Sequence, residues 1–154
     1  MALPAAPGGV TTRTVRPEDY DAIIAVMDAW WDKPTGLLNR LHLDHFHGTS
    51  LIAEGAGGAL TGFVVGFLSP SRTDEAHIHF TGVAPRRRTG LARSLHEQFF
   101  ATARRNDHKV VKAIASPQNS RSIAFHTAKG FAYSEPVAGY DGPGQDRVVF
   151  ARRL

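Results

Sequence analysis

The sequence predicts a single α/β domain, in which helices cover the faces of a mixed β-sheet. First, a length of 154 residues with 42% hydrophobic and 21% charged residues is typical of one globular domain. Second, the apolar pattern changes along the chain in the order β-α-α-β-β-β-α-β-α-β-β, as in a sheet with helices packed on it. Third, neither a repeat nor a linker divides the chain. We expect residues 10–154 to form the domain, and residues 1–9, rich in Ala, Pro and Gly, to be a disordered tail.

The first half of the chain combines a strand, two helices and a hairpin. Pro17 and the two acids after it begin a helix, because proline and negative charge are both favourable in a first turn. Ile23, Ile24, Met27 and Trp31 continue an apolar stripe at helical spacing. The expected elements are a strand at 10–16, a helix at 17–31, a short helix indicated by Leu37, Leu38, Leu41 and His45 that ends near Gly48, and a hairpin of strands at 50–54 and 60–69.

The second half of the chain alternates strands and helices. Leu91, Leu95 and Phe99 form the inner face of an amphipathic helix, and Gly130 suits a left-handed cap after the next one. The expected elements are strands at 76–83, 109–115, 131–137 and 147–151, and helices at 90–105 and 122–128.

Composition and charge narrow the class of function. The net charge is +4, and without Arg86, Arg87, Arg88 and Arg93 the remaining positive charges equal the negative ones. Positive charge concentrated at one place suits a small polyanion better than a nucleic acid, whose partners spread basic residues along a face. The absence of cysteine excludes a disulfide and a cysteine nucleophile. No apolar run is long enough to span a membrane and no targeting signal is visible, so we expect a cytoplasmic protein that binds no membrane.

The segment from His77 to Arg93 is the most informative part of the chain. A strand with two histidines runs into a loop of arginines, and Gly90 then opens an amphipathic helix. The first backbone N–H groups of a helix have no intrahelical acceptor and lie at its positive end, so this turn suits a phosphate or diphosphate. The alternative is a solvated basic loop before a helix.

Several histidines are candidates for proton transfer. His77 and His79 share one strand face by two-residue periodicity, and Ile78 and Phe80 take the other. An imidazole can remove the proton of an amine near neutral pH. The alternative is a pair of core histidines. A metal site at the three nearby histidines is not expected, since no further ligand completes it; these residues are His42, His45 and His47.

The ordered motifs resemble those of the GNAT superfamily of acyl-CoA-dependent N-acetyltransferases. They are Val83-x-Pro85, Arg87-x-x-Gly90-x-Ala92, Asn119 and Phe125-His126-x-x-x-Gly130-Phe131. The resemblance implies a single-domain fold with a mixed, mostly antiparallel sheet, acetyl-CoA as co-substrate, no metal, and direct transfer to an amine. The residues that it implies for acetyl-CoA binding are Thr81, Gly82, Val83, Arg88, Thr89, Gly90, Leu91, Ala92, Arg93 and Asn119. For Gly82 and Asn119 the alternatives are a simple strand bend and a helix cap.

Two departures from the family pattern bear on the chemistry. The loop before Gly90 is one residue short, and His126 stands where the family usually has a tyrosine near the thiol. His126 is therefore a candidate general acid, with plain helix packing as the alternative. The ribosomal-protein alanine acetyltransferases have a glutamate five residues before the asparagine, where this chain has Ile114.

The acceptor is expected to be a primary amine, and a small molecule. The His77-x-His79 pair is similar to that of arylalkylamine N-acetyltransferases, which implies a proton path from the amine. Trp30 and Tyr140 are candidates for the acceptor wall, with core packing and an ordinary loop position as their alternatives. Acetylation of a protein or peptide, and an acyl-CoA-binding module without turnover, stay open. An unpaired strand edge near the C-terminus would permit a homodimer.

Overall fold

The computed structural model describes residues 9–31, 38–85 and 90–154. Within these residues the strands form a seven-stranded mixed sheet in the order β1-β2-β3-β4-β5-β7-β6. Strand β4 pairs with β5 in parallel, whereas β1 with β2, β2 with β3, β5 with β7 and β6 with β7 pair antiparallel. The predicted fold class, a mixed and mostly antiparallel sheet with helices, is therefore confirmed. The expected tail at 1–9 lies almost wholly outside the described residues.

The chain divides into two compact units, Met1–Phe67 with Ile78–Thr102 and Leu68–His77 with Ala103–Leu154. We call them the first and the second unit. Strand β4 (Glu75–Val83) and helix α3 (Leu91–Arg105) contribute to both. The other strands and α-helices of the first unit are β1 (Thr11–Thr14), α1 (Tyr20–Trp31), α2 (Arg40–Phe46), β2 (Leu51–Glu54) and β3 (Leu60–Leu68), and the final residue of β3 belongs to the second unit. This unit also contains three 3-10 turns, at Pro17–Asp19, His47–Thr49 and Ala56–Gly58.

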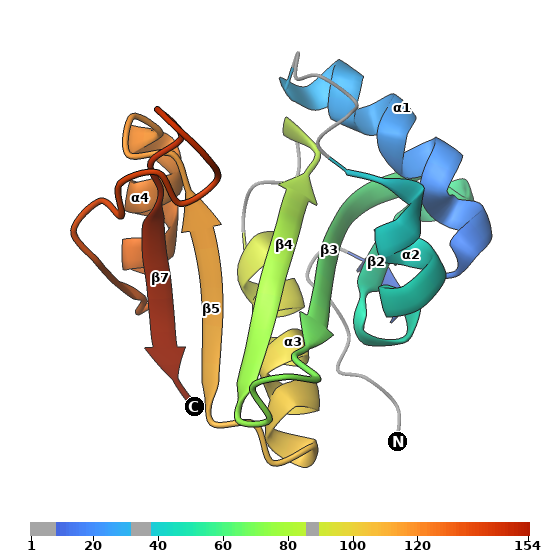
Figure 1. Cartoon of the computed structure of the whole chain (residues 1–154). Helices are drawn as coiled ribbons and strands as arrows, with labels where there is room; N and C mark the ends of the chain where they lie inside the picture. The colour runs from blue at the N-terminus through green and yellow to red at the C-terminus, as the bar shows by residue number, and fades with distance from the viewer. Residues whose placement is uncertain (1–8, 32–37, 86–89) are drawn as a thin grey trace. The chain divides into compact units, whose positions relative to one another are not determined.

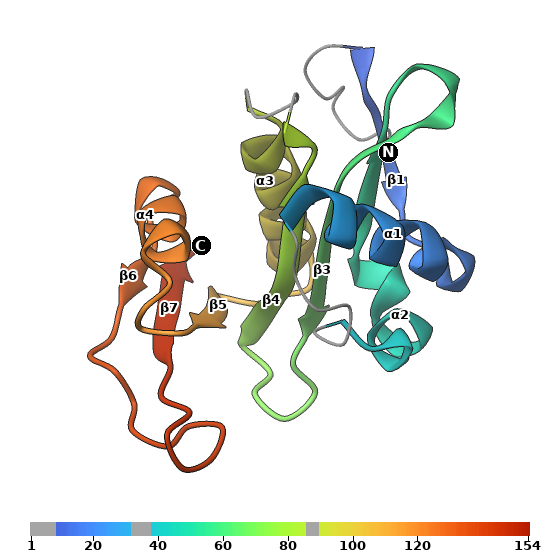
Figure 2. The same ribbon diagram turned by 90° about the horizontal axis from the view of Figure 1, so that it is seen from above.

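Strand β3 separates two helical layers in the first unit. Phe63 and Val65 point toward α1 and α2, where they join Ile23, Met27 and Leu43 in one buried core cluster. Gly62 points the other way, and a Cβ atom built on it would lie 3.1 Å from Leu91 Cδ2 of α3. Figures 1 and 2 accordingly show α1 and α2 on one side of β3 and α3 on the other. Because successive side chains of β3 point to opposite faces, each helical layer packs on one face of this strand.

The second unit is built around β5 (Val110–Ala115) and β7 (Val148–Arg153). Six residue pairs join these strands, from Val110↔Arg153 to Ala115↔Val148. Helix α4 (Ser120–Ala128) lies beside this pair (Figure 1). The His126 ring of α4 stacks on the Phe150 ring of β7. Strand β6 (Ala132–Tyr133) adds the edge, and β4 contributes three parallel pairs that end at His77↔Lys112.

Four details differ from the sequence prediction. The strand expected at 131–137 shrinks to β6 and an isolated bridge between Val137 and Arg147. Helix α4 begins at Ser120, two residues earlier than expected, because Asn119 caps it. In α2 the buried leucine is Leu43, whereas Leu41 is 63% exposed. The first helix begins as a 3-10 turn, so α1 itself starts at Tyr20. In the described part of the chain no helix has the length and apolar character needed to cross a membrane.

Candidate active site

His79 and Phe80 of β4 both contact the side of the first unit that contains α1 and α2. Phe80 packs against the core cluster beneath α1 and α2, and the His79 ring stacks on His42 of α2. The next side chain, Thr81, is hydrogen-bonded to His96 of α3. The contacts of His79 and Phe80 therefore do not follow the strict alternation that the sequence predicts.

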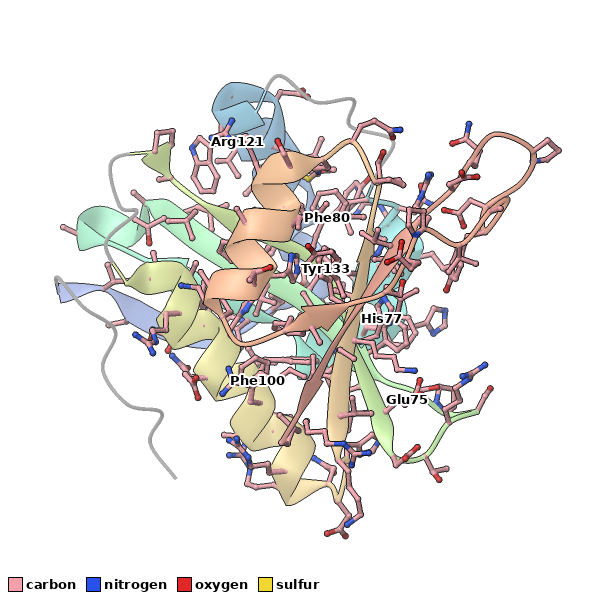
Figure 3. All side chains as sticks on the ribbon, turned by 90° about the vertical axis from the view of Figure 1, so that its left-hand side faces the viewer. Glu75, His77, Phe80, Phe100, Arg121 and Tyr133 are labelled. Atoms are coloured by element: carbon pink, nitrogen blue, oxygen red, sulfur yellow. The ribbon has the colours of Figure 1, made fainter. Side chains whose placement is uncertain are left out.

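His77 lies two residues before His79 on β4 and is half-buried. Burial lowers its pKa below the ordinary value of 6.5. The negative charge of Glu75 opposes this shift, and the positive charge of Lys112 adds to it. Glu75 is itself bound to Lys112, with its carboxylate 2.8 Å from the lysine Nζ; Figure 3 labels Glu75 and His77 on β4. A depressed pKa keeps the His77 imidazole neutral near pH 7, the form that can accept a proton.

The contact between His42 and His79 was not predicted from the sequence. The His42 ring lies parallel to that of His79, with centroids 4.0 Å apart and an interplanar angle of 5°. The sequence connects His42 only with His45 and His47, as metal candidates. His45 is exposed, and His47 Nδ1 is 2.8 Å from the Leu43 carbonyl oxygen. No cluster of three or more His, Cys, Asp or Glu side chains suited to a metal occurs within the described ranges.

Helix α3 begins directly after Gly90. Gly90 has φ +80°, and its carbonyl oxygen accepts the hydrogen bond of Ser94 N–H, which begins the helix. Leu91 is buried, so the first turn is anchored in the core while Arg93 stays exposed. The N–H groups of Leu91, Ala92 and Arg93 belong to this first turn, where backbone donors have no intrahelical acceptor, and diphosphate binding by them stays a prediction. Arg88 and Thr89, also expected at this site, lie outside the described residues.

Three successive residues of β4 were expected to contact the pantetheine arm through their backbone. The Thr81 hydroxyl is 2.9 Å from His96 Nε2, so this side chain is used inside the protein. Gly82 is buried, and its carbonyl oxygen would lie 3.2 Å from a Cβ atom placed on Gly62. Just beyond Val83, the Ala84 N–H donates to the Thr61 carbonyl oxygen at 2.9 Å. One side-chain hydrogen bond and two backbone contacts therefore fix the end of β4 on β3 and α3.

Asn119 caps helix α4. Its Oδ1 accepts a hydrogen bond from Ser122 N–H at 3.0 Å. The capping alternative is thus observed, and it is compatible with pantetheine binding because it uses the amide oxygen and not the Nδ2 donor.

His126 is packed on three sides by rings. It stacks on Phe150 at 4.2 Å and meets Phe125 and Phe131 edge-on at 5.3 Å. Its Nδ1 is 2.8 Å from the Ser122 carbonyl oxygen, so this nitrogen carries a proton and donates. Burial lowers the pKa of His126, although the bond to Ser122 opposes that shift. The neutral ring is consequently favoured at physiological pH.

The sequence profile of the acetyltransferase (GNAT) family matches residues 15–131, about three quarters of the chain. The chain belongs to the GNAT acetyltransferase family. It is accordingly an acetyl-CoA-dependent acetyltransferase. No curated protein matches the sequence significantly.

Solved GNAT structures share the fold at low sequence identity. Ard1 from Thermoplasma volcanium is 23% identical, with a TM-score of 0.75 over 96% of this chain and 99% of that one. The ribosomal-protein-S18-alanine N-acetyltransferase of Escherichia coli is 18% identical, with a TM-score of 0.73 over 94% of both chains. The diaminobutyrate acetyltransferase EctA of Paenibacillus lautus is 22% identical, with a TM-score of 0.68 over 92% and 93%. The last was solved with L-2,4-diaminobutyric acid and coenzyme A.

The two residues expected at the acceptor wall of this GNAT enzyme have different surroundings. Trp30 is half-buried, stacks on Phe63 at 6.2 Å and packs against the core cluster. Tyr140 is 49% exposed, in the loop between β6 and β7. The packing alternative for Trp30 is therefore observed, although the exposed part of the ring can still contribute to a wall.

Proposed function

We propose that this GNAT enzyme transfers the acetyl group of acetyl-CoA directly to the primary amine of a small molecule. One observation carries the proposal: His77 and His79 lie on β4, the strand that precedes Gly90 and α3 in the chain. A strand that places titratable groups close in sequence to a diphosphate-binding turn suits deprotonation of an amine near a thioester.

The residues that hold acetyl-CoA follow from this arrangement. The diphosphate binds the first-turn N–H groups of α3, from Leu91 to Arg93, beside Gly90 and the sequence-predicted Arg88 and Thr89. The backbone of residues 81–83 aligns the pantetheine arm, and an N–H group of this strand polarises the thioester carbonyl. Asn119 Nδ2 donates to the same arm. Each of these roles is a proposal that rests on local geometry and on the family pattern.

The chemical step needs two protons removed from the ammonium form of the acceptor. The neutral imidazole of His77, with His79, takes the first proton directly or through water and so produces the free amine. The free amine attacks the thioester carbon, and the carbon–sulfur bond breaks to release the thiolate of coenzyme A. The nitrogen still carries one excess proton after the attack, and this second proton passes to the thiolate and leaves a neutral amide and a thiol. The acid role of His126 stays a prediction, and its contacts support the packing alternative.

A small-molecule acceptor is favoured by two features. The His-x-His pair is similar to that of arylalkylamine N-acetyltransferases, and EctA, which has the same fold, was solved with a small diamino acid as its substrate. Ile114 stands where the alanine acetyltransferases have a glutamate. The second candidate is acetylation of a protein or peptide amine, since Ard1 and the S18-alanine enzyme have the same fold.

A panel of acceptors tests the proposal. The purified chain is incubated with acetyl-CoA and with phenylethylamine, putrescine or peptides carrying a free α-amine or lysine, and the release of free thiol is followed. We expect kcat/KM to be at least about tenfold higher for a small amine than for any peptide, a free-energy difference of ~1.4 kcal/mol. A peptide as the best acceptor would favour the second candidate. We also propose a cytoplasmic location, which cell fractionation checks.

A further inference from the structure

Helix α2 brings a ring against the proposed proton acceptor of β4. His42 and His79 are stacked face to face, 4.0 Å apart, from elements that are distant in the sequence. Leu43, the next residue of α2, is fully buried in the core cluster and fixes the helix. Phe46, one turn on, lies 6.2 Å from His42 and stacks on Phe67 at 4.7 Å. The position of the His42 ring is therefore determined by packing on both sides.

One nitrogen of His42 is enclosed by the packing. Its Nδ1 is inaccessible and has no hydrogen-bond partner among the residues that the structure describes. Ring contacts, rather than a hydrogen bond at Nδ1, therefore hold this side chain, and His42 presents the flat face of its ring to His79.

We infer that His42 is a positioning residue, whose stacked ring holds the His79 imidazole in the orientation needed for proton removal. The inference rests on the proposed role of His79. The second side-chain torsion of a histidine is broad and poorly restrained on its own. A parallel ring at 4.0 Å removes most of that freedom, because rotation of His79 would bring its edge into the face of His42. Orientation of a base matters to rate, since a small misplacement can cost up to about a hundredfold.

Two variants distinguish the effect of a flat ring at position 42 from the effect of its nitrogen atoms. His42→Phe keeps a flat ring and removes both nitrogens, whereas His42→Leu fills similar space without a plane. The matched control is His45→Ala, which removes an exposed imidazole from the same helix. The assay uses the full chain, acetyl-CoA and the best amine of the panel above, and circular dichroism checks that each variant is folded.

We expect His42→Leu to lower kcat about tenfold with little change in the KM for acetyl-CoA, and His42→Phe to retain most of the activity. His45→Ala should match the wild type. In NMR spectra the His79 ring-proton signals should shift in the Leu variant, because the ring current of His42 is lost, and this readout needs no acceptor. Unchanged kcat in the Leu variant, or equal losses in the Leu and Phe variants, would overturn the inference.

The variant His79→Gln distinguishes this inference from the proposed function. If it has wild-type activity, the base role of His79 fails and the inference fails with it. If it is impaired while His42→Leu is not, only the inference fails. If both are impaired and the double variant is no worse than His79→Gln, the two rings act together, as inferred.

Discussion

His77 and His126 illustrate how residue surroundings set the chemistry of two imidazoles. Burial lowers the pKa of each. His77 has charged neighbours of both signs, Glu75 and Lys112, while His126 has three aromatic rings and one backbone carbonyl. A neutral imidazole suits a base, and a general acid needs the protonated form. The structure thus supports a proton-accepting role for His77 better than a proton-donating role for His126.

The buried ring of His126 predicts a pH dependence of stability. Because its pKa is lower in the folded chain than the unfolded value of 6.5, the unfolded state binds the proton more readily. The stability due to a neutral His126 is therefore present above that value and is lost as the pH falls below it. In His126→Phe, the loss of unfolding free energy between about pH 7.5 and pH 5.5 should be smaller than in the wild type. Denaturant unfolding at both pH values measures it, and an equal loss would contradict the assignment.

Two substitutions of Asn119 distinguish its role as a helix cap from its proposed role in binding coenzyme A. Asn119→Ala should lower the unfolding free energy by about 1 kcal/mol, since Ser122 N–H loses its acceptor. Asn119→Asp keeps a carboxylate oxygen as the cap but lacks the Nδ2 donor. We expect the Asp variant to be as stable as the wild type and to bind coenzyme A as weakly as the Ala variant does in calorimetry. Wild-type affinity of both variants would limit Asn119 to capping.

Residue identity alone predicts roles that depend on near neighbours in the sequence. The cap at Asn119 and the left-handed Gly130 follow from residue type and local position. The stack of His42 on His79 does not, because it joins a helix and a strand that only the fold brings together. No spacing rule in the sequence marks such a pair.

At the scale of elements, the helices and strands follow from periodicity, but the contacts at the end of β4 do not. Strict alternation assigns His79 and Phe80 to opposite faces, whereas His79 stacks on His42 of α2 and Phe80 packs against the core cluster beneath α1 and α2. Periodicity predicts the face of a strand residue but not which helix its side chain contacts. Likewise, the segment after Phe131 has apolar residues suited to a strand, yet it pairs over two residues only.

The packing of α3 on β3 depends on Gly62. A Cβ atom there would lie 3.2 Å from the Gly82 carbonyl oxygen and 3.3 Å from Leu95 Cδ1, and the backbone oxygen cannot easily move. We predict that Gly62→Ala lowers the unfolding free energy by about 1–3 kcal/mol and weakens coenzyme A binding, because the first turn of α3 is displaced. Thermal unfolding and calorimetry measure these effects.

Gly48→Ala is the matched control for this substitution. Its Cβ atom would meet nothing within 4 Å, and its φ is not in the left-handed region. The control should therefore bind coenzyme A like the wild type. Equal binding by the Gly62 variant would show that close packing of α3 on β3 does not position the diphosphate turn.

For the whole molecule, the order of motifs along the chain predicted the family and the fold class, and the family match confirms both. Four loose motifs are specific together because they occur in one defined order along the chain. The identity of the acceptor is harder to predict, because it depends on side chains from several elements, such as Trp30 and Tyr140. The distances between such side chains cannot be read from the sequence. The concentration of arginines at 86–88 lies outside the described residues, and its role stays a prediction.

The central claim is that imidazoles on β4 deprotonate an amine next to acetyl-CoA. The most direct test is the pH dependence of kcat/KM for acetyl transfer, compared between the wild type and the double variant His77→Gln, His79→Gln. We predict that the wild type loses activity on the acid side with a pKa below 6.5, because protonation of His77 removes the base. The double variant should be about 10²- to 10⁴-fold slower and should lack this acid limb. A folded double variant with unchanged rate and pH profile would contradict the account.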